Sequence, residues 1–102
     1  MLKTFRKVVP FITLNDFLSK ASAVERFTSS HCRRYLVTGI EDDKILFRRL
    51  DAKERKGWSM NLKNVFKAYQ ELEDFATINF KPFVPITHSP ARGLLLHLEM
   101  LQ

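Results

Sequence analysis

The segment from Tyr35 to Leu50 limits the possible folds more than any other part of the sequence. Two runs rich in β-branched, aromatic and aliphatic residues, 35–40 and 44–50, flank Asp42-Asp43, and this pattern predicts a β-hairpin that turns at the two aspartates. A register that pairs Glu41 with Lys44 places Leu36, Thr38, Ile40, Ile45, Phe47 and Arg49 on one face, and Tyr35, Val37, Gly39, Leu46, Arg48 and Leu50 on the other. Both faces are then largely apolar, so the C-terminal third of the chain or a partner must cover the second one.

Apolar residues at helical spacing predict three helices around this hairpin. The first is capped by Thr13 and runs to about Ser29, the second is capped by Asn61, and the third starts at Ser89-Pro90 with Ser89 as its cap. The three apolar stripes consist of Leu14, Phe17, Leu18, Ala21, Val24 and Phe27; of Leu62, Val65, Phe66, Tyr69 and Leu72; and of Leu94, Leu95, Leu98 and Leu101.

The remaining segments complete an α+β domain with a small antiparallel sheet of three to four strands and three helices, in the order α-β-β-β-α-(β)-α. Residues 1–12 are expected to form an edge strand or an arm, Trp58 to Met60 a short third strand, and Phe75 to Phe80 an optional fourth. The chain of 102 residues fits a single domain spanning 1–102, in which 75–102 form an extension that packs on the sheet or on a partner.

The composition points to a folded protein that does not span a membrane. Apolar residues make up 45% of the chain, enough to offset the entropy cost of ordering. No apolar run approaches the roughly 18–20 residues of a membrane-spanning helix, and the first ten residues do not resemble a signal peptide. The single Cys32 excludes an internal disulfide. We therefore expect a cytoplasmic protein.

The positive charge is concentrated in one part of the sequence. Between Lys44 and Lys67 there are eight basic and two acidic residues, so this stretch accounts for the whole net charge of +6. Such asymmetry favours binding to nucleic acid or another polyanion over a merely solvated basic surface. The candidate binding residues are Arg48, Arg49, Lys53, Arg55, Lys56, Lys63 and Lys67. A basic loop at 51–57 beside the start of the second helix would form a phosphate-binding cradle.

No combination of residues indicates catalysis, a metal or a cofactor. His31 and Cys32 are adjacent, but neighbours in an extended chain point to opposite sides, so they do not form a nucleophile and base pair. One cysteine and three scattered histidines lack the spacing of a zinc site. The three glycines occur singly, which excludes a glycine-rich phosphate loop. We expect no enzyme and no cofactor.

The order α-β-β-β-α predicted for residues 13–73 resembles that of double-stranded RNA-binding domains. The resemblance concerns the order of elements only. The second helix begins Asn61-Leu-Lys-Asn-Val-Phe-Lys67 and lacks the tight basic cluster of that family. The resemblance implies RNA binding by analogy of fold, and no family is identified by a motif.

Two functions from different classes follow from the sequence. The first is a non-enzymatic nucleic-acid-binding or accessory module whose cations contact phosphates. The second is a protein-interaction or assembly module, a homodimer or a partner of an acidic protein, that uses an apolar sheet face and the segment 80–86. An enzyme whose site is completed by another chain is the third and weakest hypothesis.

Overall fold

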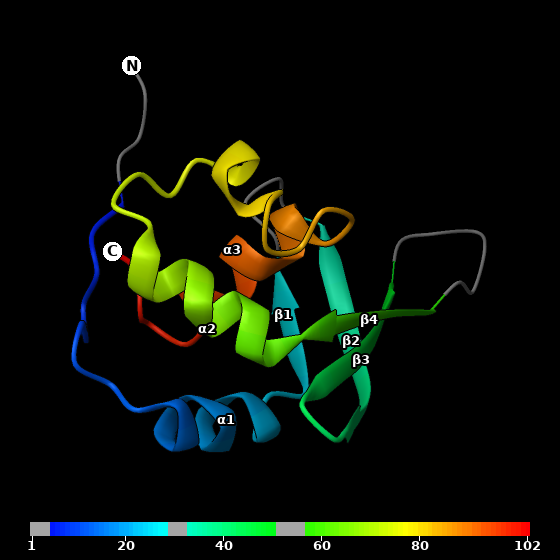
Figure 1. Cartoon of the computed structure of the whole chain (residues 1–102). Helices are drawn as coiled ribbons and strands as arrows, with labels where there is room; N and C mark the ends of the chain where they lie inside the picture. Colours follow the sequence, from blue (N-terminus) through cyan, green and yellow to red (C-terminus); the bar gives the residue numbers. More distant parts are fainter. Residues whose placement is uncertain (1–4, 29–32, 51–56) are drawn as a thin grey trace.

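The computed structural model describes residues 5–28, 33–50 and 57–102. They form an α+β fold with three α-helices, one 3-10 helix and one four-stranded antiparallel sheet (Figure 1), which confirms the predicted class. The elements are α1 (Leu14–Ser22), β1 (Arg26–Thr28), β2 (Arg34–Glu41), β3 (Lys44–Arg49), β4 (Gly57–Asn61), α2 (Leu62–Glu71), the 3-10 helix η1 (Thr77–Phe80) and α3 (His88–His97). The additional strand precedes the hairpin, where none was predicted.

The sheet and the helices form two layers. The strands lie in sequence order, β1-β2-β3-β4, and the three α-helices lie on one side of them (Figure 1). The side chains that the strands bury on this side are Phe27, Tyr35, Ile45, Phe47 and Met60. Tyr35 lies at the centre of this group, with its ring centroid 5.2 Å from that of Phe27 and 5.3 Å from that of Phe47. We call this side of the sheet the core face and the opposite side the outer face.

A β-bulge in β2 changes the predicted assignment of faces. The pairs Glu41↔Lys44 and Ile40↔Ile45 form as expected, but the register shifts between Val37 and Gly39. Thr38 is therefore an additional residue, and every residue of β2 before it changes sides. The prediction that put Tyr35 and Arg48 on one face was wrong: Tyr35 belongs to the core face, while Arg48 pairs with Leu36 on the outer face.

The first helix ends at Ser22, earlier than predicted. Thr13 does cap it, because its Oγ1 accepts a hydrogen bond from the Asp16 N–H at 3.1 Å. Beyond Ser22, however, the residues around Phe27 form β1 and pair with β2. Val24 and Phe27 are buried as their spacing predicted, at 7% and 2% exposure, but a strand rather than a helix buries Phe27. Pairing with the hairpin outweighed the weak local preference for helix.

The predicted strand over 75–80 is instead a turn followed by η1. The Asp74 carboxylate accepts a hydrogen bond from the Ala76 N–H at 3.1 Å, and the Asn79 side chain donates to the Asp74 carbonyl at 2.9 Å. These local bonds compete with an extended conformation and turn the chain back. Phe75 and Phe80 are nevertheless both buried.

The third helix starts one residue before the predicted cap. Thr87 occupies the N-cap position and Pro90 the third helical position, so Ser89 is not the cap. Pro90 is tolerated there because the first turn of a helix has no use for its missing N–H. This shift leaves the Thr87 and Ser89 side chains free of a capping role.

Tyr69 connects the two ends of the described chain. Its hydroxyl oxygen accepts a hydrogen bond from the Val9 N–H at 3.2 Å and its proton is donated to the Met100 carbonyl at 2.9 Å. Nearby, Arg6 and Gln102 exchange two backbone hydrogen bonds of 2.8 and 3.0 Å. The N-terminal arm thus lies antiparallel to the last residues and is held there by a side chain of α2.

We predict that Tyr69→Phe destabilises the protein by about 1–3 kcal/mol, because the Val9 N–H loses its partner in a partly buried position. Urea denaturation followed by circular dichroism measures this. Tyr35→Phe is a matched control. It removes the hydroxyl of another buried tyrosine, one that forms no hydrogen bond between elements of the described structure. Equal stability of Tyr69→Phe and Tyr35→Phe would contradict the bridging role.

The same hydroxyl should make stability depend on alkaline pH. Burial raises the pKa of Tyr69 above its usual value, against a smaller lowering by hydrogen bonds from the backbone at Val9 and Val8. The neutral phenol is therefore favoured in the folded state, and its contribution is present below about pH 10 and lost as the pH rises through the folded pKa. Urea titrations from pH 9 upward, spanning about two pH units, should show a steeper loss of stability for the wild type than for Tyr69→Phe.

Candidate nucleic-acid interface

The seven predicted binding residues do not share one surface in the described part of the chain. Lys53, Arg55 and Lys56 lie outside the described residues. Arg48 and Arg49 are neighbours on β3 and point to opposite faces of the sheet. Lys63 and Lys67 lie on the exposed side of α2, in the helical layer. Of the four candidates that the structure describes, Arg48 alone is on the outer face.

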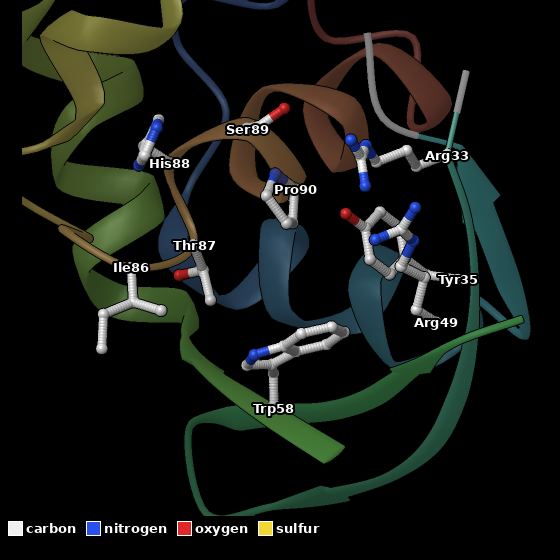
Figure 2. Close-up of a pocket in the computed structure, with 9 residues that line it drawn as sticks. All are labelled: Arg33, Tyr35, Arg49, Trp58, Ile86, Thr87, His88, Ser89 and Pro90. Atoms are coloured by element: carbon white, nitrogen blue, oxygen red, sulfur yellow. The ribbon is translucent and has the colours of Figure 1, made fainter. Parts of the chain in front are cut away.

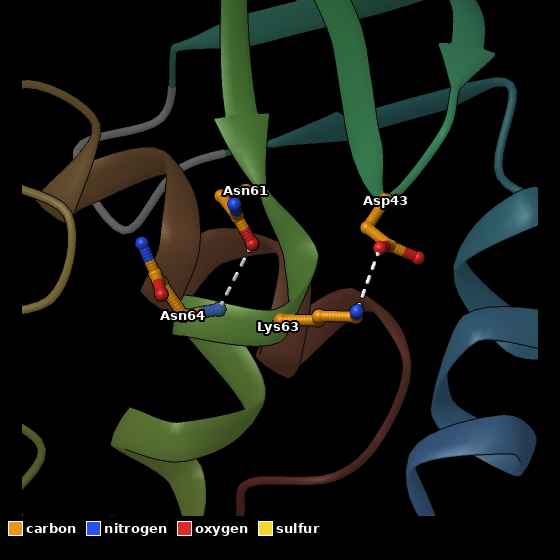
Figure 3. Close-up of polar contacts among 4 residues, drawn as sticks. All are labelled: Asp43, Asn61, Lys63 and Asn64. Carbon is orange, nitrogen blue, oxygen red and sulfur yellow. Dashed lines mark hydrogen bonds and ion pairs between the residues drawn. The ribbon is translucent and has the colours of Figure 1, made fainter.

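Lys63 is occupied by an ion pair that links α2 to the hairpin turn. Its Nζ lies 3.0 Å from the Asp43 carboxylate (Figure 3). The same turn accepts a backbone hydrogen bond of 2.7 Å from Leu62 to the Asp43 carbonyl. Asn61 caps the helix, since its Oδ1 accepts from the Asn64 N–H at 3.2 Å. The start of α2 is thus satisfied by an amide and approached by an acidic side chain, which is unfavourable for a phosphate.

The predicted cradle also required the segment 51–56 to approach the start of α2. Gly57, the residue that follows this segment, is the first residue of β4, and α2 begins where β4 ends. At about 3.3 Å per residue, five residues of strand separate the two points by roughly 16 Å. The residues that flank the segment therefore lie at the opposite end of the sheet from the helix start.

Arginines from three strands meet on the outer face instead. Leu36 pairs with Arg26 of β1 on one side and with Arg48 of β3 on the other, which forms a transverse row of three side chains. Arg34 lies on the same face, two residues before Leu36. Arg26 and Arg34 are exposed, whereas Leu36 and Arg48 are half-buried. We call Arg26, Arg34, Leu36 and Arg48 the arginine row.

Among the described strand residues, those on the outer face include no aromatic side chain and a single acidic one. The strand residues Phe27, Tyr35, Phe47 and Trp58 all lie on the core face, where their rings pack together. The four strands contain five basic residues but a single acidic one, Glu41, at the hairpin end. The face therefore offers positive charge and aliphatic surface, without rings on which bases would stack.

Sequence reasoning missed two residues of the row for separate reasons. Arg26 was assigned to the first helix, so its place beside the hairpin was not foreseen. The bulge also decides between Arg33 and Arg34. The predicted register put Tyr35 on the face of Arg48, and strand alternation would then place Arg33 there too, whereas with the bulge Arg34 takes that place. The preference of Val24 and Phe27 for strands was the one signal in the sequence for β1.

Other site types find no support in the described residues. Within 5–28, 33–50 and 57–102 no three His, Cys, Asp or Glu side chains cluster as metal ligands. No helix in these ranges has the length and apolar character needed to cross a bilayer. Comparison with protein-family models, with curated proteins and with solved structures gives no significant match. Function must therefore be inferred from the chain's own surfaces.

We predict that Lys63 has little structural importance although it is ion-paired. Both partners are exposed, at 57% and 38% of their side-chain area, so Lys63→Ala should cost at most about 1 kcal/mol. Asn61→Ala, which removes the helix cap two residues away, should cost about 0.5–2 kcal/mol. Urea denaturation of both variants measures the difference, and a larger loss for Lys63→Ala would show that the turn depends on the ion pair.

Proposed function

We propose that the protein is a small non-enzymatic module that binds nucleic acid at its phosphate backbone through the arginine row. The observation that carries this proposal is the pairing of Arg26, Leu36 and Arg48 across three strands, on a sheet face that no described helix covers. Phosphate oxygens are the acceptors that a guanidinium fork matches best.

Two arginines of the row, Arg26 and Arg48, make it suited to an anion. Neither Arg26 nor Arg48 forms an ion pair with a described residue. Their aliphatic stems flank Leu36, which accounts for its partial burial on an uncovered face. An arginine side chain whose stem packs against Leu36 loses less conformational entropy when it binds an anion than a side chain that extends into water.

The lack of aromatic residues on this face determines the kind of binding. Without stacking rings, affinity must come from phosphate contacts, which carry no information on base sequence. Binding should therefore be insensitive to base sequence and should weaken steeply with salt. In a plot of log K against log salt concentration, each duplex phosphate that the protein neutralises should add about −0.9 to the slope. Lys63 and Lys67 lie on α2, in the other layer, and are not part of the proposed surface.

We predict that the double variant Arg26→Gln/Arg48→Gln lowers duplex affinity at least tenfold at low salt and reduces the salt slope by about 1.8, for two lost phosphate contacts. The charge-matched control Lys63→Gln/Lys67→Gln should bind as the wild type does. Fluorescence anisotropy with a labelled duplex at several salt concentrations provides both numbers.

Three outcomes are informative. If Lys63→Gln/Lys67→Gln loses binding and Arg26→Gln/Arg48→Gln does not, the binding site is on α2 and not on the outer face. A strong base preference would contradict a backbone contact. No binding to any nucleic acid at low salt, together with a dimer by sedimentation, would favour the second function, an assembly module.

That second function has its own structural support, although less than expected. Within the segment 80–86, Phe80 and Val84 are buried in the protein's own core, so the segment is largely used internally. Ile86, at 78% exposure, and Ile78, at 64%, remain available to a partner. A homodimer or an acidic protein partner would bury these two side chains.

A further inference from the structure

A second surface with anion-binding chemistry lies on the other side of the sheet. A cavity of about 430 Å³ opens between the core face and the start of α3. Figure 2 shows its lining: two arginines and Tyr35 on one side, the first residues of α3 on the other, and the Trp58 ring between them. Pockets of about 300–1,000 Å³ hold small organic ligands, so the cavity has room for more than a single ion.

The two arginines converge because of strand geometry. Arg49 pairs directly with Tyr35 across β2 and β3, and Arg33 precedes Tyr35 by two residues, which puts all three on the core face. Figure 2 shows Arg33, Arg49 and Tyr35 on the same side of the cavity. No aspartate or glutamate is among the described residues that line the cavity. Two arginines on one wall of the cavity offer several N–H donors in the fork geometry that matches phosphate oxygens.

Two residues that line the cavity also carry polar atoms without a hydrogen-bond partner. Arg49 Nε and Ser89 Oγ are both buried and have no hydrogen-bond partner in the described structure. Such atoms are rare in native proteins, because each costs the lost solvation of its donor or acceptor. Both residues line the cavity, from opposite sides. Because a molecule the size of water does not reach these two atoms, a ligand in the cavity would bind through the remaining N–H groups of Arg49 and the backbone N–H groups at the start of α3.

The start of α3 adds further donors. α3 has ten residues, and its first backbone N–H groups, those of His88 and Ser89, have no partner within the helix. Thr87 is only 6% exposed and lines the cavity, yet its hydroxyl does not cap the helix. Backbone N–H groups at the positive end of a helix dipole favour phosphate in particular.

We propose that this cavity binds a phosphate monoester, with the phosphate between Arg49, Arg33 and the α3 start and the organic group against Trp58. The wall formed by Trp58, Ile86 and Pro90 is apolar and suits a planar ring. Two sources share this chemistry: a free mononucleotide and the phosphorylated end of a nucleic-acid strand. The site is separate from the arginine row and does not depend on the function proposed above.

The test uses the full chain and its single tryptophan. Titration with adenosine monophosphate should change Trp58 fluorescence and give saturable binding by calorimetry, inorganic phosphate should bind more weakly, and adenosine should not bind. Arg49→Gln should weaken binding of the monophosphate about ten- to a hundredfold, because it removes charged hydrogen bonds. Arg49→Lys keeps the charge but not the fork and should recover only part of the affinity.

Controls separate this site from the outer face and from loss of folding. The variant Arg26→Gln/Arg48→Gln should bind the monophosphate as the wild type does. In this variant, an oligonucleotide with a 5′-phosphate should displace the monophosphate better than the same oligonucleotide with a 5′-hydroxyl, if phosphorylated strand ends are the natural ligand. Equal competition by the two oligonucleotides assigns the site to free nucleotides. The proposal is overturned if adenosine binds as well as the monophosphate, if the monophosphate does not bind, or if folded Arg49→Gln and Arg49→Lys variants both bind it with unchanged affinity.

Discussion

The packing of four aromatic rings against the helices determines what the rest of the sheet displays. Phe27, Tyr35, Phe47 and Trp58 come from four different strands and contact one another on the core face. Burying rings of this size contributes several kcal/mol, far more than any single surface charge. Once the rings are fixed on one side, strand alternation turns their neighbours outward, and Arg26, Arg34 and Arg48 are among these neighbours.

The sequence predicted the elements whose signals are local. The caps Thr13 and Asn61, the hairpin turn and the apolar stripe of α2 all appear in the structure as expected, because each depends on residues a few positions apart. It did not predict β1, η1 or the start of α3, since these depend on contacts with distant elements. Of the site, the sequence identified the cationic stretch and the opposite directions of Arg48 and Arg49, but not the neighbours that join Arg48 from β1 and β2. Three of the predicted cations lie outside the described residues.

The two surfaces with anion-binding chemistry differ in the environment of their arginines. On the outer face, solvent and salt screen the charges, so attraction is broad and adjustable. In the cavity, Arg49 is partly enclosed and screened less, which favours a defined ligand in a defined orientation. One strand, β3, supplies an arginine to each surface from consecutive positions, Arg48 and Arg49, so the two proposed sites lie on opposite sides of the same sheet.

The bulge at Thr38 decides which side chains of the first half of β2 lie on the outer face, because it adds one residue to the strand. If a deletion removed the bulge, the first half of β2 would turn over: Tyr35 and Arg33 would face solvent, and Leu36 and Arg34 would face the helices. The outer face would then present an aromatic ring suited to stacking on bases, at the expense of the buried cluster. A deletion of one residue, with no change in the type of the others, would thus exchange an arginine for an aromatic ring on the outer face.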